Sequence, residues 1–391
     1  MRKDQNGFTL IEILVAITIL GIIMLMNTQL MQNLLQGSAR QNAIVTTQFE
    51  TALGLELMRT DIENAGFGLA DDINGIIYTE ADAASVPAFQ YNDAPTNVPR
   101  ALVHSNDGST GAPAAQHYIA NSDYLVIKSP AVGENGAAKK WTYITPTAIH
   151  VWDAVNTNND MDMETNPVNH MIVIKPRTQV GGAAKLIKST TTPPFAVHYP
   201  ASFGSLNTDF IPVGVGERYI AYGVNRDASV ELRMPFNRAD YYVRQRATSN
   251  DNPNCAPGTG TLVKATVDHN GGGLTEMPLI TCVANMQVIF RLDTNGDGIP
   301  DTTVGSTPAL PALSAMQIKE QVKEVRVYIL AHEGPRDNGY TLPATSRLVT
   351  VGDTAALGRS VDLLSDVVGN ATWANYRWKV YTLFVKPRSF Y

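Results

Sequence analysis

Residues 8–26 read FTLIEILVAITILGIIMLM, and Glu12 is the only charged residue in this stretch. About 20 apolar residues in a helix are enough to cross the roughly 30 Å hydrocarbon core of a membrane. Arg2 and Lys3 precede the stretch, and the next basic residue is Arg40. Because basic residues tend to stay on the cytoplasmic side, we expect a cytoplasmic N-terminus and export of the remaining chain.

Two other kinds of segment share this composition. A secretory signal has a basic start, an apolar middle and a cleavage site built from small residues. Gly37 and Ala39 could form such a site, but they lie more than ten residues beyond the apolar run. A plain signal anchor is the second alternative. It leaves Glu12 unexplained, because an ionisable group inside a membrane span is costly and is normally paired.

The residues Gly7-Phe8-Thr9-Leu10-Ile11-Glu12 resemble the processing motif of type IV pilins and type II secretion pseudopilins. This resemblance implies that a prepilin peptidase removes residues 1–7 as a leader and methylates the new amine of Phe8. It also implies that Glu12 pairs with the N-terminal amine of a neighbouring subunit. A carboxylate buried in lipid needs a cationic partner, and a newly made terminal ammonium can supply one. The motif therefore favours a prepilin over both alternatives.

An amphipathic pattern continues beyond the apolar run, and no proline interrupts it before Pro87. Apolar residues recur four positions apart, as on one face of a helix: Val45, Phe49, Leu53 and Leu57. Gly66 is a suitable stop for this helix. We therefore expect one helix over residues 8–64, about 80 Å long, of which residues 8–26 span the membrane.

The sequence changes after residue 64 to short strand-like runs separated by loops rich in Asn, Gly, Pro and Thr. The chain has 30 Gly, 22 Pro and only 17% charged residues, which favours strands and turns over helical bundles. We expect an α+β fold in which residues 65–391 form an exported β-rich head, with an antiparallel sheet resting on the long helix. An inserted subdomain is expected around residues 90–270.

Strand-like patterns within the head are short and bounded by turn residues. The predicted strands are residues 123–129, 170–175, 218–224, 230–234, 240–246, 262–267, 285–292, 325–332 and 377–385. Short helices are expected at residues 315–324 and 360–368.

Four further segments are similar to PilW-type minor pilins, and they lie toward both ends of the head. They are residues 57–68 (LMRTDIENAGFG), 283–288 (VANMQV), 322–328 (VKEVRVY) and 376–381 (YRWKVY). The resemblance does not extend to residues 90–270. The chain also ends in Lys386-Pro387-Arg388-Ser389 rather than in the basic-plus-Asn ending of that family.

This resemblance implies a structural protein, a minor pilin of a type IV pilus that lies at or near the tip and helps to initiate assembly. The implied partners are prepilin peptidase, other major and minor pilins and the inner membrane. Before assembly the head would be periplasmic and the N-terminus cytoplasmic, and afterwards the subunit would lie in a cell-surface pilus. The alternatives are a J-type pseudopilin of type II secretion, a calcium-dependent adhesin on a pilin stem, and a membrane-anchored enzyme.

Charge and motif content argue against two other classes of function. The formal net charge is −6, and no basic stripe offers the clustered Lys and Arg that nucleic-acid binding needs. Residues 214–219 begin like a dinucleotide loop but have Tyr where Gly is required. Residues 332–333 lack the second His of a zinc-protease helix, and residues 358–362 lack the closing Gly of a nucleophile elbow. We predict that the protein is not an enzyme.

Residues 293–301 read DTNGDGIPD, with side-chain oxygens at positions 1, 3, 5 and 9 and Gly at position 6. Calcium prefers about six to eight oxygen ligands, and this spacing folds oxygens around one centre. The predicted ligands are the side chains of Asp293, Asn295, Asp297 and Asp301 and the backbone carbonyl of Ile299. Val304 replaces the bidentate Glu of a full EF-hand loop, so the loop is similar to the shortened calcium loops of exported adhesive proteins. The alternative is a metal-free turn, which Asx and Gly residues also favour.

Cys255 and Cys282 are the only two cysteines, and both lie in the expected head. An oxidising compartment outside the cytoplasm favours their pairing. A disulfide between them would stabilise the head by about 3–4 kcal/mol in the chain-entropy model. Two separate buried thiols are the alternative.

Overall fold

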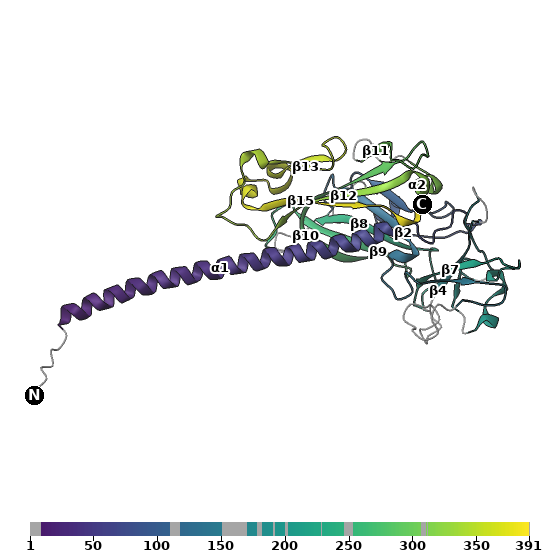
Figure 1. Ribbon diagram of the computed structural model, residues 1–391, viewed down its shortest axis with the longest axis horizontal. Coiled ribbons are helices and arrows are strands. Elements are labelled where there is room, and N and C mark those ends of the chain that lie inside the picture. Colours follow the sequence, from purple (N-terminus) through teal and green to yellow (C-terminus); the bar gives the residue numbers. More distant parts are fainter. Residues whose placement is uncertain are drawn as a thin grey trace, which may run out of the picture.

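The computed structural model combines a long N-terminal helix with a β-rich head, which confirms the predicted α+β fold (Figure 1). The structure describes residues 9–109, 118–150, 170–177, 182–190, 192–199, 202–227, 229–245, 253–305, 310 and 312–390. Short 3₁₀ turns connect its larger elements, at Ala88–Tyr91, Pro130–Val132, Phe203–Ser205, Thr208–Phe210, Ala344–Ser346, Ala371–Asn375 and Arg388–Phe390.

The long helix α1 (Leu10–Glu63) is continuous over 54 residues. Its N-terminal part projects from the head, and its last turns lie along the main sheet (Figure 1). The chain turns away just after the helix at Gly66, whose φ of +75° favours glycine. A Cβ at this position would lie 2.8 Å from the ring of Phe390. The predicted stop at Gly66 is therefore close to the observed helix end.

The main sheet of the head is antiparallel and has the order β1-β2-β8-β9-β10-β12-β15, with β11 paired to β10. Its strands are β1 (Leu102–Ser105), β2 (Tyr124–Ser129), β8 (Asn237–Gln245), β9 (Gly260–Val267), β10 (Leu274–Leu292), β11 (Thr302–Val304), β12 (Val322–Glu333) and β15 (Arg377–Val385). α1 packs against β10, β12 and β15. Val288, Phe290 and Val327 belong to the core that also holds Met58 and Ile62 of the helix.

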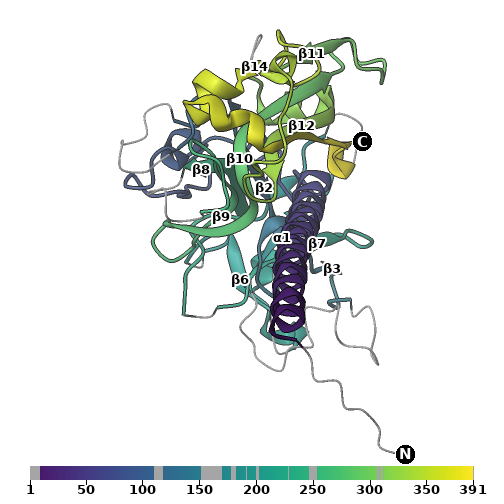
Figure 2. The ribbon, with the colours of Figure 1, turned by 90° about the vertical axis from the view of Figure 1, so that its left-hand side faces the viewer.

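A small lobe, residues 334–376, covers the other face of the sheet. It lies between β12 and β15 and contains β13 (Leu348–Val351), β14 (Arg359–Asp362) and a π-helical turn (Leu363–Val368). Figure 2 looks nearly along α1 and shows this yellow lobe above the sheet, with the helix below. Successive side chains of a strand point to opposite faces, so Ile289 and Leu330 pack with Val361 and Trp373 of the lobe, away from the helix.

A second, smaller sheet has the order β3-β7-β4-β5, with β6 paired to β4. Its strands are β3 (Trp141–Ile144), β4 (His170–Lys175), β5 (Lys185–Leu186), β6 (Ala196–His198) and β7 (Tyr219–Asn225). It has a hydrophobic cluster of its own, which includes Ile144, Met171, Val173, Phe210 and Ala221. Figure 1 shows β4 and β7 at the end of the head farthest from the N-terminus.

The chain leaves the main sheet after Ser129 and returns to it at Asn237, and these two residues are paired across β2 and β8. Residues 130–236 are therefore an insertion within one β-hairpin of the main sheet. This insertion is narrower than the subdomain expected around residues 90–270, because β1, β2, β8 and β9 belong to the main sheet.

A short helix, α2 (Ala315–Gln321), leads directly into β12. Ser314 caps its start, and Gln317 completes a reciprocal capping box. The helix ends three residues before the predicted end at residue 324, because β12 begins at Val322.

Candidate functional site

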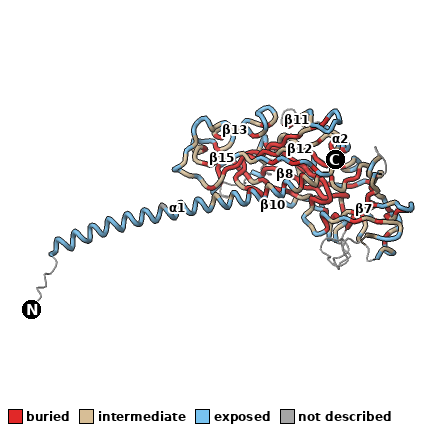
Figure 3. Tube along the Cα trace, viewed as in Figure 1, coloured by how far each residue is buried: buried red, intermediate tan, exposed pale blue. Residues whose placement is uncertain are grey.

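The N-terminal half of α1 is an exposed apolar surface. The helix is long and apolar enough to cross a membrane, and no residue of its most apolar 18-residue window is buried. Figure 3 shows this part of the chain as exposed along its length, whereas the buried residues lie in the head and in the last turns of α1. Because apolar surface of this extent is unfavourable in water, the segment requires lipid or other apolar helices around it.

Glu12 lies in the first turn of this exposed segment and is held by Thr9. The Glu12 Oε2 accepts the backbone N–H and the hydroxyl of Thr9, both at 2.8 Å. The Thr9 hydroxyl in turn accepts the backbone N–H of Glu12 at 3.4 Å, which completes a capping box. Gly7 and Phe8, the predicted processing residues, lie outside the described residues. Pairing of Glu12 with an amine of a neighbouring subunit stays a prediction.

The C-terminal end of α1 is anchored in the head by a buried ion pair. The Asp61 carboxylate lies 2.7 Å from the Lys264 Nζ of β9, and the Tyr241 hydroxyl of β8 donates to it at 2.7 Å. Burial and the neighbouring Asp61 raise the pKa of Tyr241 well above its ordinary value, so its hydroxyl stays a neutral donor. Met58 and Ile62 are fully buried beside this pair.

A second, more exposed contact joins the middle of α1 to the start of the lobe. Arg40 Nη1 lies 3.0 Å from Asp337 Oδ1, and the Gln48 amide donates to Glu333 Oε2 at 2.9 Å. Burial alone would raise the pKa of Glu333, but hydrogen bonds from Gln48 and Tyr381 help to lower it below its ordinary value. The lobe is thereby held beside a part of the helix that lies well before its buried end.

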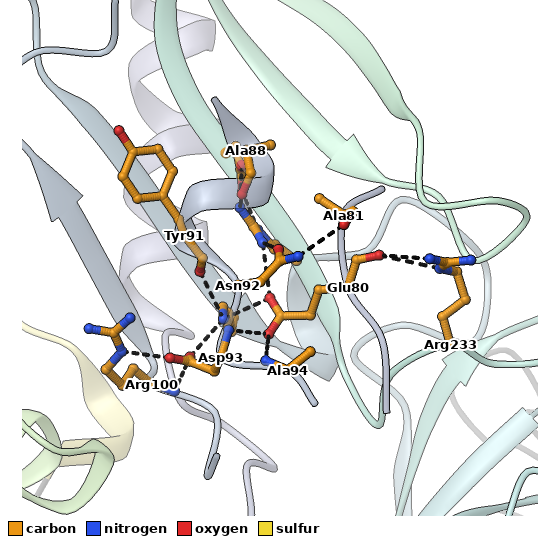
Figure 4. A network of polar contacts seen from close by, with 12 residues as sticks. Glu80, Ala81, Ala88, Tyr91, Asn92, Asp93, Ala94, Arg100 and Arg233 are labelled. Atoms are coloured by element: carbon orange, nitrogen blue, oxygen red, sulfur yellow. Dashed lines mark hydrogen bonds and ion pairs between the residues drawn. The ribbon is translucent and has the colours of Figure 1, made fainter. Parts of the chain in front are cut away.

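A buried network of charged side chains fixes the segment between α1 and β1 onto the main sheet (Figure 4). Lys128 Nζ lies 2.7 Å from both Glu80 Oε2 and Asp93 Oδ2. Arg238 contacts Glu80 at 2.9 Å and Asp240 at 2.8 Å. Charged groups removed from water need such partners, and loss of one leaves the others uncompensated. The network therefore has a structural role, which is to hold the segment between α1 and β1 on the main sheet.

The structure joins Cys255 and Cys282 in a disulfide, which confirms the predicted pairing. His332 packs beside it, and its Nε2 accepts the backbone N–H of Ala256 at 2.8 Å. That bond places the ring proton on Nδ1, which contacts the carbonyl of Gly334 at 3.0 Å. The ligand atoms of Cys255, Cys282 and His332 all lie within 4.8 Å of one another, as the ligands of a metal ion would. Within the described part of the chain, no other group of three His, Cys, Asp or Glu residues does so. Sulfurs bonded to each other are not thiolate ligands.

The predicted calcium loop connects β10 to β11 and wraps around the carboxylate of Asp293. This carboxylate accepts the backbone N–H groups of Gly296 at 2.7 Å, Asp297 at 3.2 Å and Gly298 at 2.8 Å. Asp293 is buried, whereas the other four predicted ligands are exposed. Lys323 Nζ lies 3.8 Å from Asp293 Oδ2 and supplies a positive charge.

The loop offers oxygen ligands, which are the kind that calcium prefers. An ionised carboxylate offers about four acceptor positions, so the three N–H donors to Asp293 leave room for a cation. Both carboxylate oxygens of Asp301 already accept hydrogen bonds, Oδ2 from the backbone N–H groups of Thr294 and Asn295 and Oδ1 from the Thr294 hydroxyl. The same hydrogen bonds would also hold a metal-free turn. Calcium binding therefore stays a prediction.

A groove of about 1060 Å³ lies between the exit of α1, the insertion and the β10–β11 loop. Phe67 and Tyr222 meet edge to face on its wall. Arg177 and Lys319 both contact Asp71 at 2.8 Å. Burial would raise the pKa of Asp71, but these two cations lower it to about 2. These three charged side chains of the groove are thus engaged with one another.

Two family models match the chain. The model for the prokaryotic N-terminal methylation motif matches residues 2–26, and the model for type IV pilus-assembly protein W matches residues 240–388. The second match covers β9 to β15 and most of β8, and thus most of the main sheet and the lobe. Residues 27–239, which include the whole insertion, lie outside both matches. No curated protein and no solved structure matches the chain.

The methylation motif, the projecting apolar helix and the β-rich head together define a prepilin-like protein that is anchored in a membrane before assembly. The two matches support a type IV pilin-like family for the chain, with a PilW-type pilus-assembly domain at residues 240–388. The motif implies processing by a prepilin peptidase and assembly with other pilins. Proteins of these families are structural rather than enzymatic.

Proposed function

We propose that this protein is a minor pilin of a type IV pilus, incorporated at or near the tip, where it helps to initiate assembly. The observation that carries the proposal is the division of the molecule into an exposed apolar helix and a head enlarged at its far end by residues 130–236. A head of this shape suits a terminal position, because a shaft subunit must pack closely against many identical copies.

The proposed mechanism follows from the two environments of α1. The apolar half is stored in the inner membrane, and assembly exchanges its lipid contacts for contacts with neighbouring helices. Such an exchange requires little net hydrophobic driving force, because lipid tails are as apolar as Leu side chains. Glu12 would then set the register of the incoming subunit by pairing with an N-terminal amine in this low-dielectric setting.

Mass spectrometry of sheared pili tests incorporation directly. We expect a peptide that begins at methylated Phe8, and immunogold labelling of the head at one end of each pilus. A Gly7→Val variant is the matched control, since it should keep its leader and be absent from the sheared fraction. An intact leader on the wild-type protein in pili would contradict the proposal, and labelling along the whole shaft would contradict the tip position.

A J-type pseudopilin of type II secretion is the competing structural function, because it would share the N-terminal motif and helix. Deletion of the gene separates the two functions. Loss of surface pili with normal protein secretion supports the pilus, and the opposite pattern supports the secretion system.

We also propose that the β10–β11 loop binds calcium, which rests on the loop wrapped around the buried Asp293 carboxylate. Exported loops of this kind bind calcium at about 10⁻⁴–10⁻³ M. Calcium in this range should raise the thermal unfolding temperature of the wild type, but not that of Asp297→Asn/Asp301→Asn. Asp268→Asn, in the turn after β9, is the matched control. An equal rise in all three proteins would place calcium elsewhere.

A further inference from the structure

Three strands of the small sheet bring metal-binding side chains to one of its ends. β4 begins at His170, β6 ends at His198 and β7 ends at Asn225. Because the three strands are antiparallel neighbours, His170 is paired with His198 on one side and with Asn225 on the other. Asp227 follows two residues after the end of β7. The two imidazoles thus lie side by side at one end of the small sheet.

The two imidazoles are in contact with each other. Their ring centroids are 4.2 Å apart, and the rings are tilted by 40°. His170 is buried, and its Nδ1 has no hydrogen-bond partner in the part of the chain that the structure describes. A buried nitrogen in this state is unusual, because buried polar groups are normally satisfied. His198 is exposed, so an ion could approach the pair from solvent.

The chemistry of this pair suits a metal. A neutral imidazole has a lone pair on one ring nitrogen, and this is the form in which histidine binds metals. The Nδ1 of His170, which has no hydrogen-bond partner within the described residues, is available for such a bond. The charge of Asp227 also acts on His170.

We propose that His170 and His198 bind a divalent transition-metal ion such as Zn²⁺, with water completing the coordination. Imidazole nitrogens favour zinc, copper or nickel over calcium and magnesium, which prefer oxygen ligands only. Two imidazoles and two waters would complete the tetrahedral coordination that zinc prefers. The bound ion would tie the start of β4 to the end of β6. This site is independent of the proposed pilus function and of the predicted calcium loop.

Titration of the full-length protein in detergent with Zn²⁺, in competition with a chromophoric chelator, tests the site. We expect one Zn²⁺ per chain. His198→Ala removes an exposed ligand and should weaken binding by more than about tenfold, because even residues that only orient a ligand contribute roughly 10–100-fold. Asp227→Asn should weaken it by a smaller factor, because Asp227 acts on His170 through its charge rather than as a ligand. The control is His150→Ala, since His150 lies in the same insertion but stacks on Tyr143.

Thermal unfolding supplies a second readout that does not depend on the chelator. Zn²⁺ should raise the unfolding temperature of the wild type and of His150→Ala, and EDTA should reverse the rise, because a ligand that binds only the folded state stabilises it. His198→Ala should unfold at the wild-type temperature without metal and show no rise with it. Absence of Zn²⁺ binding to the wild type, or equal affinity in His198→Ala, would overturn the proposal.

Discussion

The two halves of α1 form one continuous helix in opposite surroundings. In the N-terminal half, apolar side chains are exposed on every side, as for Leu10 at 81% and Leu34 at 64%. In the C-terminal half only one face is covered, so that Met58 and Ile62 are fully buried while Phe49 remains 72% exposed. The difference teaches that helical structure alone does not reveal whether a segment lies in lipid or against a folded domain. The distribution of apolar residues reveals it, because they lie all around the first half of the helix but pack on one face of the second half.

This contrast separates assembly from stability along one helix. No residue is buried over the most apolar window of the exposed half, so substitutions there should alter insertion and packing between subunits. The buried half is part of the main core, so substitutions there should alter the folding of the head. Four substitutions test this separation, and they are ordered from the largest expected effect to the smallest.

Asp61→Ala tests the buried half most strongly. It leaves the buried Lys264 with only the more exposed Glu134, 3.9 Å away, as a carboxylate partner, and removal of one member of a buried ion pair costs about 3–5 kcal/mol. We expect urea unfolding, followed by tryptophan fluorescence, to show a loss of this size in the free energy of unfolding. Glu56→Ala is the matched control, because that side chain is 67% exposed. Equal effects of the two variants would show that the ion pair does not anchor the helix.

Glu12→Ala tests the exposed half. We expect normal leader cleavage and an unchanged unfolding temperature of the head, because the hydrogen bonds of the Glu12 side chain within the described residues are with Thr9. Recovery in sheared pili should fall by roughly tenfold or more, which corresponds to a loss of about 1.4 kcal/mol of pairing energy. Glu50→Ala, farther along the same helix, should be incorporated normally. Wild-type recovery of Glu12→Ala would remove the pairing role of this carboxylate.

Two glycines of α1 form a matched pair for the same comparison. A Cβ at Gly54 would lie 3.0 Å from both the Ile280 side chain and the Leu279 carbonyl, whereas a Cβ at Gly37 would meet nothing within 4 Å. Gly54→Ala should therefore destabilise the head. Overpacking costs about 1–3 kcal/mol, whereas replacing Gly by Ala in a helix gains about 1 kcal/mol. Gly37→Ala should increase helical circular dichroism without destabilising the head. A higher unfolding temperature for Gly54→Ala would contradict this close approach.

Arg40→Ala should have the smallest effect. The Arg40 side chain is 46% exposed, and exposed ion pairs contribute about 0.2–1 kcal/mol. A double-mutant cycle with Asp337→Asn isolates the coupling, which should decrease as salt is added. A coupling above about 2 kcal/mol, unaffected by salt, would mean that the middle of α1 belongs to the folded head rather than to the exposed segment.

Local patterns were sufficient to predict the helix and several strands. The predicted strands 170–175 and 377–385 have the observed bounds of β4 and β15, because each is an uninterrupted run of strand-forming residues. Residues 230–234 are not a strand, since Leu232 and Met234 pack into the core from an irregular segment. Residues 360–368 are not one helix, because β14 extends to Asp362 before the π-helical turn begins.

Longer-range features could not be predicted from local patterns. β10 begins at Leu274 rather than at residue 285, although Pro278 and the positive φ of Cys282 interrupt it. Its neighbours β9 and β12 accommodate these interruptions as shifts of register. The bounds of the insertion were equally hidden, because the pairing of Ser129 with Asn237 joins residues far apart in the sequence.

Candidate sites made of residues close in the sequence could be predicted, whereas sites made of residues from distant strands could not. The processing motif around Glu12, the two cysteines and the loop at Asp293 are visible because each depends on residue type or close spacing. The ion pairs of Glu80 and the pairing of His170 with His198 depend on the arrangement of distant strands. A charged residue within a strand pattern normally indicates exposure, so the buried charges gave a misleading local signal.

The hairpin that carries residues 130–236 has an evolutionary consequence. Ser129 and Asn237 already face each other across the β2–β8 ladder, and two antiparallel strands can be joined by as few as about two residues. Selection can therefore lengthen, shorten or exchange the outer part of the head without altering the ladder beneath it. The membrane helix and the strands that hold it would experience no change, so descendants of one ancestor could present different surfaces from the same stem.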